Sequence, residues 1–498
     1  MNLFKLFIKI SSITFISRLF GFIRDTIIAY IFGIGNKTDS FFISFKIPNA
    51  FKKTFSENTI YQTFVPILIK KKKNKKDLQK FISNSIGLII IIVGIITVLY
   101  LLNIKNLIKI LAPGFLINLK KYNLTLKISK ITTPYLIIIS ITSFINSILY
   151  SWKYFTIISI MPILLNLVII IFILLFFVIN KSSILVLAWS VIFGSILQLI
   201  IQLKYLNKIK ISIFPKFNIF DKDIKMAFKK LFLISINSII LQSSGIINIM
   251  FISLFISGSI SWSYYADRLI DLPVGVLGVT ITVILLPLLT KNNFFYKNKN
   301  VFNYGLKLGF LFSIPSSIAI MILSKPIIIT LFQYGKFSYF DTIMTSKIVK
   351  SYSISIIGNT FVKILTTNLY SKNDVNTPIL MSIITLLFSQ LINLFIIKKS
   401  IYYIFYISLS ISSCINALLL FYKTKSKYKI YLEKGWINFF LKIILSSITM
   451  SLVLFIMLNF VTILEKDKIF LRFLKIIFLI FIGISTYLIT LFTTKIKL

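Results

Sequence analysis

Stretches of about 20 mostly apolar residues recur along the whole chain, and short polar segments rich in lysine separate them. An apolar stretch of about 20 residues is long enough to cross the hydrocarbon core of a bilayer as an α-helix. The pattern therefore predicts an all-α, polytopic membrane protein. Fourteen spans are expected, at residues 7–33, 38–69 (broken), 82–104, 128–151, 158–179, 184–203, 231–256, 263–290, 304–323, 345–369, 377–397, 401–422, 437–460 and 470–494.

The distribution of lysines indicates which ends of the spans face the cytoplasm. Residues 70–80 hold seven lysines, residues 204–230 hold eight and residues 423–434 hold five. All three segments fall on one side of the membrane if the spans alternate in direction, and basic loops are typical of the cytoplasmic side. We therefore expect both termini in the cytoplasm and the basic loops near anionic lipid headgroups.

Three short segments recur in the second half of the chain at nearly one offset. "FVPILIKK" (64–71) resembles "LLPLLTKN" (285–292), "LAPGF" (111–115) aligns with "FQYGKF" (332–337), and "LYS" recurs at 149–151 and 369–371. Six expected spans separate matching points, so the halves have the same orientation, which is typical of a parallel repeat.

The repeat predicts two MATE-like lobes of six helices each. Residues 1–204 form the N-terminal lobe, residues 205–230 a basic cytoplasmic linker and residues 231–422 the C-terminal lobe, with two additional helices in 435–498. Transporters built in this way bind substrate between their lobes, whereas the alternative is a duplication kept only for packing.

Composition excludes several classes of protein. The chain is 57% hydrophobic and carries a net charge of +43, but its lysines lie between apolar spans, which argues against a nucleic-acid-binding protein. It has no histidine and one cysteine, Cys414, so a disulfide framework, a histidine triad and a thiol metal cluster are excluded. With no Walker A, G-x-S-x-G or H-E-x-x-H motif either, we predict that the protein is not an enzyme and needs no cofactor.

Charged residues inside the expected spans are the strongest sign of function. A charge at mid-bilayer costs about 2.5–3.5 kcal/mol on insertion scales, so such residues face water-filled space or one another. Three of the four arginines and five of the thirteen acidic residues lie in or beside the first, second and eighth spans. The cations are Arg18, Arg24, Lys46, Lys52, Lys53 and Arg268, and the acids are Asp25, Asp39, Glu57, Asp267 and Asp271.

Two interpretations of these charges remain open. The cations outnumber the carboxylates, so a cavity that they line favours an anion, and the planar fork of arginine suits phosphate oxygens. Alternatively, pairs such as Arg18 with Asp25 and Arg268 with Asp271 only lock helices together.

Helical periodicity separates the two arginines of the first span. Arg18 shares a helix face with Asp25, and Ser17 shares another face with Arg24, about 120° away at 100° per residue. A straight helix cannot aim both arginines at one phosphate, so either the helix bends at Gly21 or the two act at different stages. Pro48 and Pro273 are the corresponding candidate hinges of the second and eighth spans.

Several motifs resemble one known family. "SRLFGFIRDTIIAYIFGIGNKTDSFFISFKIPN" (17–49), "TFVPIL", "APGF", "SWSYYADRLIDLPVGVLGV", "LFQYGKF" and "LYSKNDVNTP" resemble blocks of the MurJ (MviN) family of lipid II flippases, within the MATE-like MOP superfamily. The resemblance implies movement of lipid II, the undecaprenyl-diphosphate-linked peptidoglycan precursor, from the inner to the outer leaflet. It also implies a cationic cavity and a groove for the lipid tail on the last two helices.

The resemblance also assigns roles to residues. It implies that Arg18, Arg24 and Arg268 hold the diphosphate and headgroup, with Lys52 and Lys53 assisting where the family often has arginines. Gate or ion-pair roles are implied for Ser17, Asp25, Asp39 and Glu57 and extended to Asp267 and Asp271. Asp374 is a weak candidate ligand for a monovalent cation, and capping of a loop is an equally good interpretation.

The expected protein is a monomeric flippase of the bacterial inner membrane that works by alternating access. Its partners are lipid II, membrane lipids and other wall-synthesis proteins, and coupling to membrane potential or to a monovalent cation is expected. Two alternatives stay open: another flippase or antiporter of the same superfamily, and a membrane scaffold for wall synthesis that transports nothing.

Overall fold

The structure is a computed structural model of the 498-residue chain. It describes residues 3–180, 183–217, 221–291, 295–372, 374, 376–397, 402–428, 435–463 and 467–494. The side chains of residues 3–11, 55–58 and 276–301, and of a few single positions, lie outside this description.

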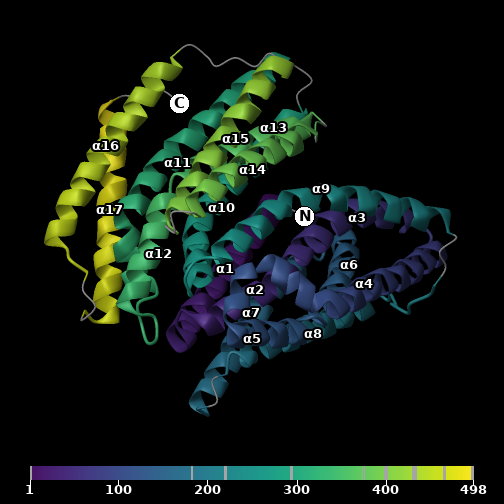
Figure 1. The fold of residues 1–498 in the computed structure, drawn as a ribbon. Coiled ribbons are helices and arrows are strands. Elements are labelled where there is room, and N and C mark those ends of the chain that lie inside the picture. The colour runs from purple at the N-terminus through teal and green to yellow at the C-terminus, as the bar shows by residue number, and fades with distance from the viewer. Residues whose placement is uncertain are drawn as a thin grey trace. The chain divides into compact units, whose positions relative to one another are not determined.

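The described residues are almost entirely helical, and no strand occurs among them, which confirms the all-α prediction (Figure 1). The elements in chain order are α1 (Leu3–Phe32), α2 (Asn36–Phe51), the π-helix η1 (Lys52–Ile60), α3 (Tyr61–Lys71), α4 (Lys75–Leu111), the 3₁₀ helix η2 (Pro113–Ile117), α5 (Leu119–Thr132), α6 (Tyr135–Ser151), α7 (Phe155–Val178), α8 (Leu185–Lys208), α9 (Lys222–Ser253), α10 (Ser259–Lys291), α11 (Phe295–Leu331), α12 (Tyr339–Tyr352), α13 (Ser355–Ser371), α14 (Asn376–Ile397), α15 (Ile404–Tyr428), α16 (Trp436–Phe460) and α17 (Ile469–Thr493).

Within the described residues, nine helical segments are long and apolar enough to cross a membrane. They include α4, α7 and α8 in the first half of the chain and α11, α14, α15, α16 and α17 in the second. The ninth segment joins α5 and α6, at residues Leu119–Ser151. Several crossings by such segments make the chain a multi-pass membrane protein.

The chain divides into two compact units, Met1–Ser261 and Trp262–Leu498. In the first unit, α1 packs on α7, α2 packs on α5, and α9 contacts α4 and η1. Phe64 of α3 joins this core, with its ring 5.0 Å from that of Phe144 on α6 and 6.1 Å from that of Phe81 on α4.

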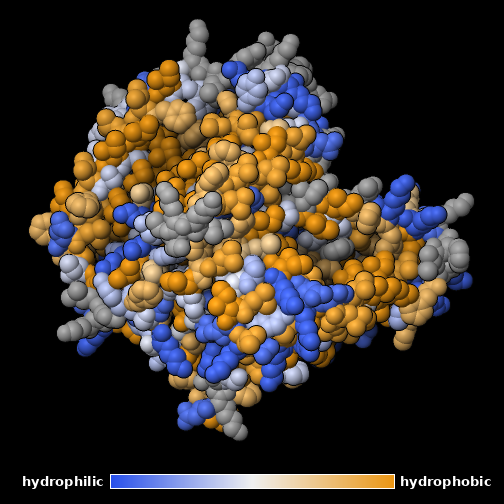
Figure 2. All heavy atoms as spheres, viewed as in Figure 1, coloured by the Kyte–Doolittle hydropathy of each residue, from blue (hydrophilic) through white to orange (hydrophobic). Residues whose placement is uncertain are grey.

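In the second unit, α13 packs on α15, and α16 and α17 pack on each other and on α11 (Figure 1). The surface of these last two helices is strongly apolar, as Figure 2 shows. Ile437 and Phe460 of α16 and Phe470 of α17 are each more than 70% exposed. Such large exposed apolar side chains are expected where a helix faces lipid instead of water.

The second expected span is irregular but not broken: the chain stays helical from Asn36 to Lys71, as α2, η1 and α3. Pro48 lies inside α2, and because proline has no backbone N–H it cannot donate the hydrogen bond of a regular helix. The π-helix η1 follows from Lys52, and Thr59 donates a side-chain hydrogen bond to the carbonyl of Thr54, five residues earlier (2.8 Å). Single π-helical turns inside α-helices are frequent at functional sites.

Candidate functional site

Arg24 is held inside the first unit by two acceptors. Its Nε and Nη2 donate to Oδ1 of Asp25, at 3.0 and 2.7 Å, and its Nη1 donates to Oδ1 of Asn166 on α7, at 2.9 Å. The side chain of Arg24 is 15% exposed and that of Asp25 is 1% exposed. Arg24, and not Arg18, is therefore the partner of Asp25, which corrects the alternative pairing considered from helix periodicity.

Asn166 also contacts the backbone of α1. Its Nδ2 lies 3.5 Å from the carbonyl oxygen of Ser17, and a Cβ added at Gly21 would lie 3.5 Å from the same nitrogen. That distance is an ordinary van der Waals contact, so the Asn166 amide packs against α1 without requiring a glycine at position 21. The helix α1 is continuous through Gly21.

Arg18 lies in a different environment from Arg24, although both are on α1. Arg18 is exposed, and Ser17 beside it is partly exposed. The structure thus keeps the two arginines apart, in agreement with the separate helix faces that their spacing predicts.

Asp39 forms a second, buried cluster in the first unit. Its Oδ2 accepts hydrogen bonds from Nζ of Lys121 (2.7 Å) and from the backbone N–H of Gly258 (2.8 Å). Its Oδ1 accepts from the backbone N–H (3.0 Å) and Oγ (2.6 Å) of Ser261. Asp39 is 1% exposed, and Nζ of Lys121 lies 4.0 Å from the ring centre of Phe115.

The Asp39 carboxylate thereby ties three elements together. It joins α2, which carries Asp39, to α5 through Lys121 and to the first turn of α10 through Ser261. A negative charge beside the free N–H groups of a helix N-terminus is stabilising. Gly258 has φ of +99°, a backbone conformation that glycine adopts readily, and this lets its N–H face the carboxylate.

The predicted lysine pair lies at the start of η1. Lys52 is partly buried and Lys53 is exposed. Lys46, two residues before Pro48, extends toward α9, where a Cβ added at Gly245 would lie 3.9 Å from its Nζ. The side chain of Glu57 lies outside the described residues.

In the second unit, the predicted charges lie on the exposed face of α10. Asp267, Arg268 and Asp271 are all exposed. Nη2 of Arg268 donates to the hydroxyl of Tyr264 at 2.7 Å, and the guanidinium carbon lies 4.9 Å from the ring centre of the same tyrosine. The tyrosine therefore orients the arginine, while the helix continues through Pro273.

The fourth arginine, Arg472, holds helices together in the second unit. It is 5% exposed, and its Nη1 donates to the carbonyls of Gln333 (3.2 Å) and Ile329 (3.4 Å), at and beyond the end of α11. Its Nε donates to the carbonyl of Asp467 at 3.0 Å. Because the last carbonyls of a helix have no partner within the helix, Arg472 caps α11 and docks α17 onto it.

Beside this contact, α11, α16 and α17 enclose an apolar groove of about 440 Å³. Leu311, Leu454 and Leu479 line it, and Pro273 of α10 contributes one edge. Tyr487 turns its hydroxyl out of the apolar surface by donating to the carbonyl of Leu311 at 2.6 Å. The groove thus has the size and lining of a site for a hydrocarbon ligand.

Asp374 is fully engaged by hydrogen-bond donors. Its Oδ2 accepts from Nζ of Lys427 (2.7 Å), Oγ1 of Thr377 (2.8 Å) and the hydroxyl of Tyr428 (3.1 Å), and its Oδ1 accepts from the N–H of Thr377 (3.2 Å). These contacts cap the start of α14 and tie it to the end of α15. A cation bound at Asp374 would have to displace Lys427.

These donors hold the pKa of Asp374 at about 2, although burial acts in the opposite direction by raising it. Since this pKa lies below the ordinary value of 3.8, the carboxylate contributes stability that is present above pH 4 and lost as the pH falls through 2. We expect Asp374→Asn to lower the thermal unfolding midpoint at pH 7, and the difference from wild type to shrink steadily toward pH 3. Lys423→Gln, a change at an exposed lysine of the same helix end, is the control and should leave the midpoint unchanged. A difference that is constant with pH would contradict this role of the carboxylate.

Two partner residues were not found from the sequence. Asn166 is the one amide side chain in the 24-residue apolar helix α7. A single amide in such a helix could have indicated a buried hydrogen-bonding partner. Lys121 resembled the other lysines of a polar loop, and nothing in its spacing marked it as buried.

The fold itself matches a class of membrane transporters. An inward-facing multidrug resistance MATE family transporter of the MOP superfamily superimposes with a TM-score of 0.69, covering 85% of this chain and 98% of that one, at 14% identity. At this identity the likeness concerns the fold alone. It defines the class of fold, which is a polytopic, all-helical membrane protein of the MATE type.

Closer relatives define the family. The model of the family "Lipid II flippase MurJ" matches residues 28–474, and the chain belongs to this family. A probable lipid II flippase MurJ of Buchnera aphidicola subsp. Acyrthosiphon pisum is 40% identical over 98% of this chain and 96% of its own length. The lipid II flippase MurJ of Burkholderia cenocepacia is 29% identical over 91% and 89%. A solved structure of lipid II flippase MurJ in an inward closed conformation has a TM-score of 0.83 and 26% identity, covering 97% of this chain and 98% of that one.

Proposed function

We propose that this protein is a lipid II flippase of the bacterial cytoplasmic membrane, which serves peptidoglycan synthesis. The observation that carries the proposal is the match to lipid II flippases over nearly the full length of both chains, in sequence and in fold. The activity is transport, so no covalent step is assigned to any residue.

For the mechanism, we propose alternating access by fourteen membrane-spanning helices, with both termini in the cytoplasm and the protein acting as a monomer. The guanidinium groups of Arg18, Arg24 and Arg268 bind the diphosphate, because arginine presents two parallel donors to phosphate oxygens. Lys52 and Lys53 add charge without the planar fork. The exposed Arg18 and Arg268 suit first contact with the headgroup, and the enclosed Arg24 suits a later stage.

Ion pairs determine how much positive charge is available to bind the headgroup. Arg24 shares its charge with Asp25 in the structure, so binding of the diphosphate at Arg24 competes with that carboxylate for the same donors. We propose that this competition resets the site after each cycle, with Glu57, Asp267 and Asp271 as further pairing partners. The cluster of Asp39 with Lys121 has a different role, which is to hold α2 to α5 and to the residues Gly258 and Ser261 within the first unit.

The apolar groove of α11, α16 and α17 is the proposed binding site of the polyprenyl tail. Its lining is hydrocarbon, and the outer faces of α16 and α17 are exposed apolar surface of the kind that contacts lipid. A tail in this groove stays at the level of the bilayer while the headgroup is moved. Arg472 keeps the groove assembled through its hydrogen bonds to α11.

Complementation tests the function in cells. Expression of this chain should restore wall synthesis and growth to bacteria depleted of their own lipid II flippase. Failure of the correctly inserted protein to do so, together with restored export of an O-antigen-type lipid-linked sugar, would favour another flippase of the superfamily. The scaffold alternative predicts no dependence on the cationic residues and is tested by the charge reversal considered in the Discussion.

We also propose that the membrane potential drives the cycle. A net charge that moves through the field gains or loses about 2.3 kcal/mol per elementary charge per 100 mV. In proteoliposomes, the rate of lipid II transfer should therefore change when a potassium diffusion potential is imposed with valinomycin. A rate that is the same at zero and at imposed potential, with sodium absent and present, would contradict coupling to either.

A further inference from the structure

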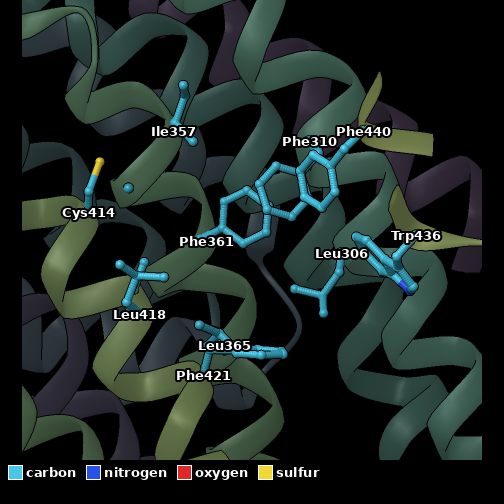
Figure 3. Close-up of a pocket in the computed structure, with 12 residues that line it drawn as sticks. Leu306, Phe310, Ile357, Phe361, Leu365, Cys414, Leu418, Phe421, Trp436 and Phe440 are labelled. Atoms are coloured by element: carbon cyan, nitrogen blue, oxygen red, sulfur yellow. The ribbon is translucent and has the colours of Figure 1, made fainter. Parts of the chain in front are cut away.

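A second apolar cavity lies in the unit Trp262–Leu498 and shares no lining residue with the groove described above. Its volume is about 320 Å³, at the lower end of the range for small-molecule sites of roughly 300–1,000 Å³. Figure 3 shows its lining, which comes from four helices. The residues are Leu306 and Phe310 of α11, Ile357, Gly358, Phe361 and Leu365 of α13, Cys414, Ala417, Leu418 and Phe421 of α15, and Trp436 and Phe440 of α16.

Close packing at one side and aromatic rings at the other create the cavity. A Cβ at Gly358 would lie 2.7 Å from the backbone nitrogen of Cys414, so the glycine lets α13 and α15 touch at this point. Across the cavity, the ring of Phe310 lies 3.6 Å from that of Phe361 and 4.4 Å from that of Phe440, centre to centre. Figure 3 shows Phe310 and Phe361 together, with Cys414 and Leu418 on the opposite side.

The lining suits hydrocarbon and opens toward the surface of the molecule. Its described residues include no charged or amide side chain, and Leu418 is 67% exposed. Three of the four helices, α11, α15 and α16, are long and apolar enough to cross the bilayer. A cavity on such helices is in contact with lipid chains instead of water, so a lipid chain is the molecule available to fill it.

Lysines of the same helices lie near the cavity, three of them at the end of α15. Phe421 is near the end of α15 and Trp436 is the first residue of α16, and tryptophan is enriched at the level of lipid headgroups. Lys425 follows Phe421 by one helical turn on the same face. The lysines of these segments that lie near the cavity are Lys423, Lys425 and Lys427 in the last two turns of α15, Lys372 just after α13, and Lys307 and Lys442 farther inside α11 and α16. Among the described residues of these segments, Asp374 is the one carboxylate, and Lys427 already pairs with it, so positive charge prevails.

We infer that this cavity binds one hydrocarbon chain of an anionic phospholipid, whose phosphate lies against the lysine-bearing end of α15. The apolar lining accommodates hydrocarbon and excludes a polar headgroup, and the surrounding charge selects an anionic headgroup over a zwitterionic one. The site is separate from the proposed substrate groove. A lipid bound there lies between α15 and α16.

Cys414 is a native reporter of occupancy because it is the single cysteine of the chain and lines the cavity. The full-length protein is placed in nanodiscs of phosphatidylcholine with or without phosphatidylglycerol, and the rate of Cys414 modification by N-ethylmaleimide is measured. Phosphatidylglycerol should slow modification at least about fivefold, the factor that the attraction of one lysine to an anionic surface supplies. Equal rates in the two lipids would overturn the selectivity for an anionic headgroup.

Two variants place the lipid in this cavity. Ala417→Phe fills the cavity, and native mass spectrometry should show loss of retained phosphatidylglycerol, whereas the control Leu441→Phe, on the exposed face of α16, should retain it. Lys425→Gln leaves the apolar packing intact and should remove the protection of Cys414 without unfolding the protein. Undiminished retention in both Ala417→Phe and Lys425→Gln would overturn the assignment.

The substrate itself is the remaining competitor for the cavity. Undecaprenyl phosphate that displaced phosphatidylglycerol and protected Cys414 equally well would make the cavity part of the substrate path, contrary to the inference. Lipid II transfer is measured on the same samples, so a protein that binds phosphatidylglycerol here but moves no lipid II contradicts the proposed function alone.

Discussion

Reversal of charge at Arg24 and Arg268 together is expected to abolish lipid II transfer and growth in complemented cells. The double substitution Arg24→Glu with Arg268→Glu replaces two donors to phosphate by two groups that repel it. Each charge-assisted hydrogen bond contributes about 1.5–3 kcal/mol, so the loss of one alone lowers transfer about tenfold or more, and the reversal of both should reduce it to background. Leaflet-resolved measurement of lipid II in the complemented cells is the readout.

The controls separate loss of binding from loss of folding. Arg24→Lys keeps the charge but loses the fork that reaches both Asp25 and Asn166, and we expect partial activity. Lys109→Glu reverses one charge at an exposed site outside the proposed binding residues and should leave transfer unchanged. Normal growth with the double variant, at normal protein levels, would favour the membrane scaffold that transports nothing.

The second large effect is expected at Asp39. Asp39→Asn leaves the ammonium group of Lys121 buried without its counter-charge, and removal of one partner of a buried ion pair costs roughly 3–5 kcal/mol. We expect a marked fall in the thermal unfolding midpoint of the purified protein. The second variant, Lys121→Met, should be destabilising too, because it leaves the Asp39 carboxylate with backbone and serine donors only.

A double-mutant cycle isolates the pair. Asp39→Asn with Lys121→Met removes both charges, so its destabilisation should be clearly smaller than the sum of the two single effects. Lys120→Met, at the exposed neighbour of Lys121, is the matched control and should have little effect. Strict additivity of the two single effects would mean that the ion pair does not hold α2 to α5.

Local sequence patterns predicted a disturbance of the second span at Pro48, because proline acts on the backbone of its own helix. The structure keeps this segment helical and changes it to a π-helix from Lys52. The patterns likewise predicted that Arg18 and Arg24 lie in different environments, since the separation follows from 100° per residue. They did not predict that Arg24 binds Asp25, because adjacent residues on a helix do not normally face each other. In the structure a long, flexible guanidinium folds back onto its neighbour, and Asn166 fixes it there from 142 positions away.

The partners of Asp39 and Arg472 could not be predicted either, because they also lie far away in the sequence. Lys121 is 82 residues from Asp39, and the carbonyls that Arg472 binds lie 139 and 143 residues away. Such contacts depend on which helices pack together, and apolar periodicity in spans that face lipid carries little information about that. The family resemblance supplied functional roles for Asp39, but only the packing of the helices revealed that Lys121 neutralises it.

Leaflet-resolved transfer of lipid II by the purified protein tests the central claim most directly. Lipid II is placed in the proteoliposome leaflet that corresponds to the cytoplasmic side. An impermeant enzyme that cleaves the headgroup is then added on the opposite side, and the fraction of lipid II that it cleaves measures the transfer. The account predicts transfer that depends on the protein and is lost in the Arg24→Glu, Arg268→Glu variant. Transfer no faster than in protein-free liposomes, or undiminished in that variant, would contradict it.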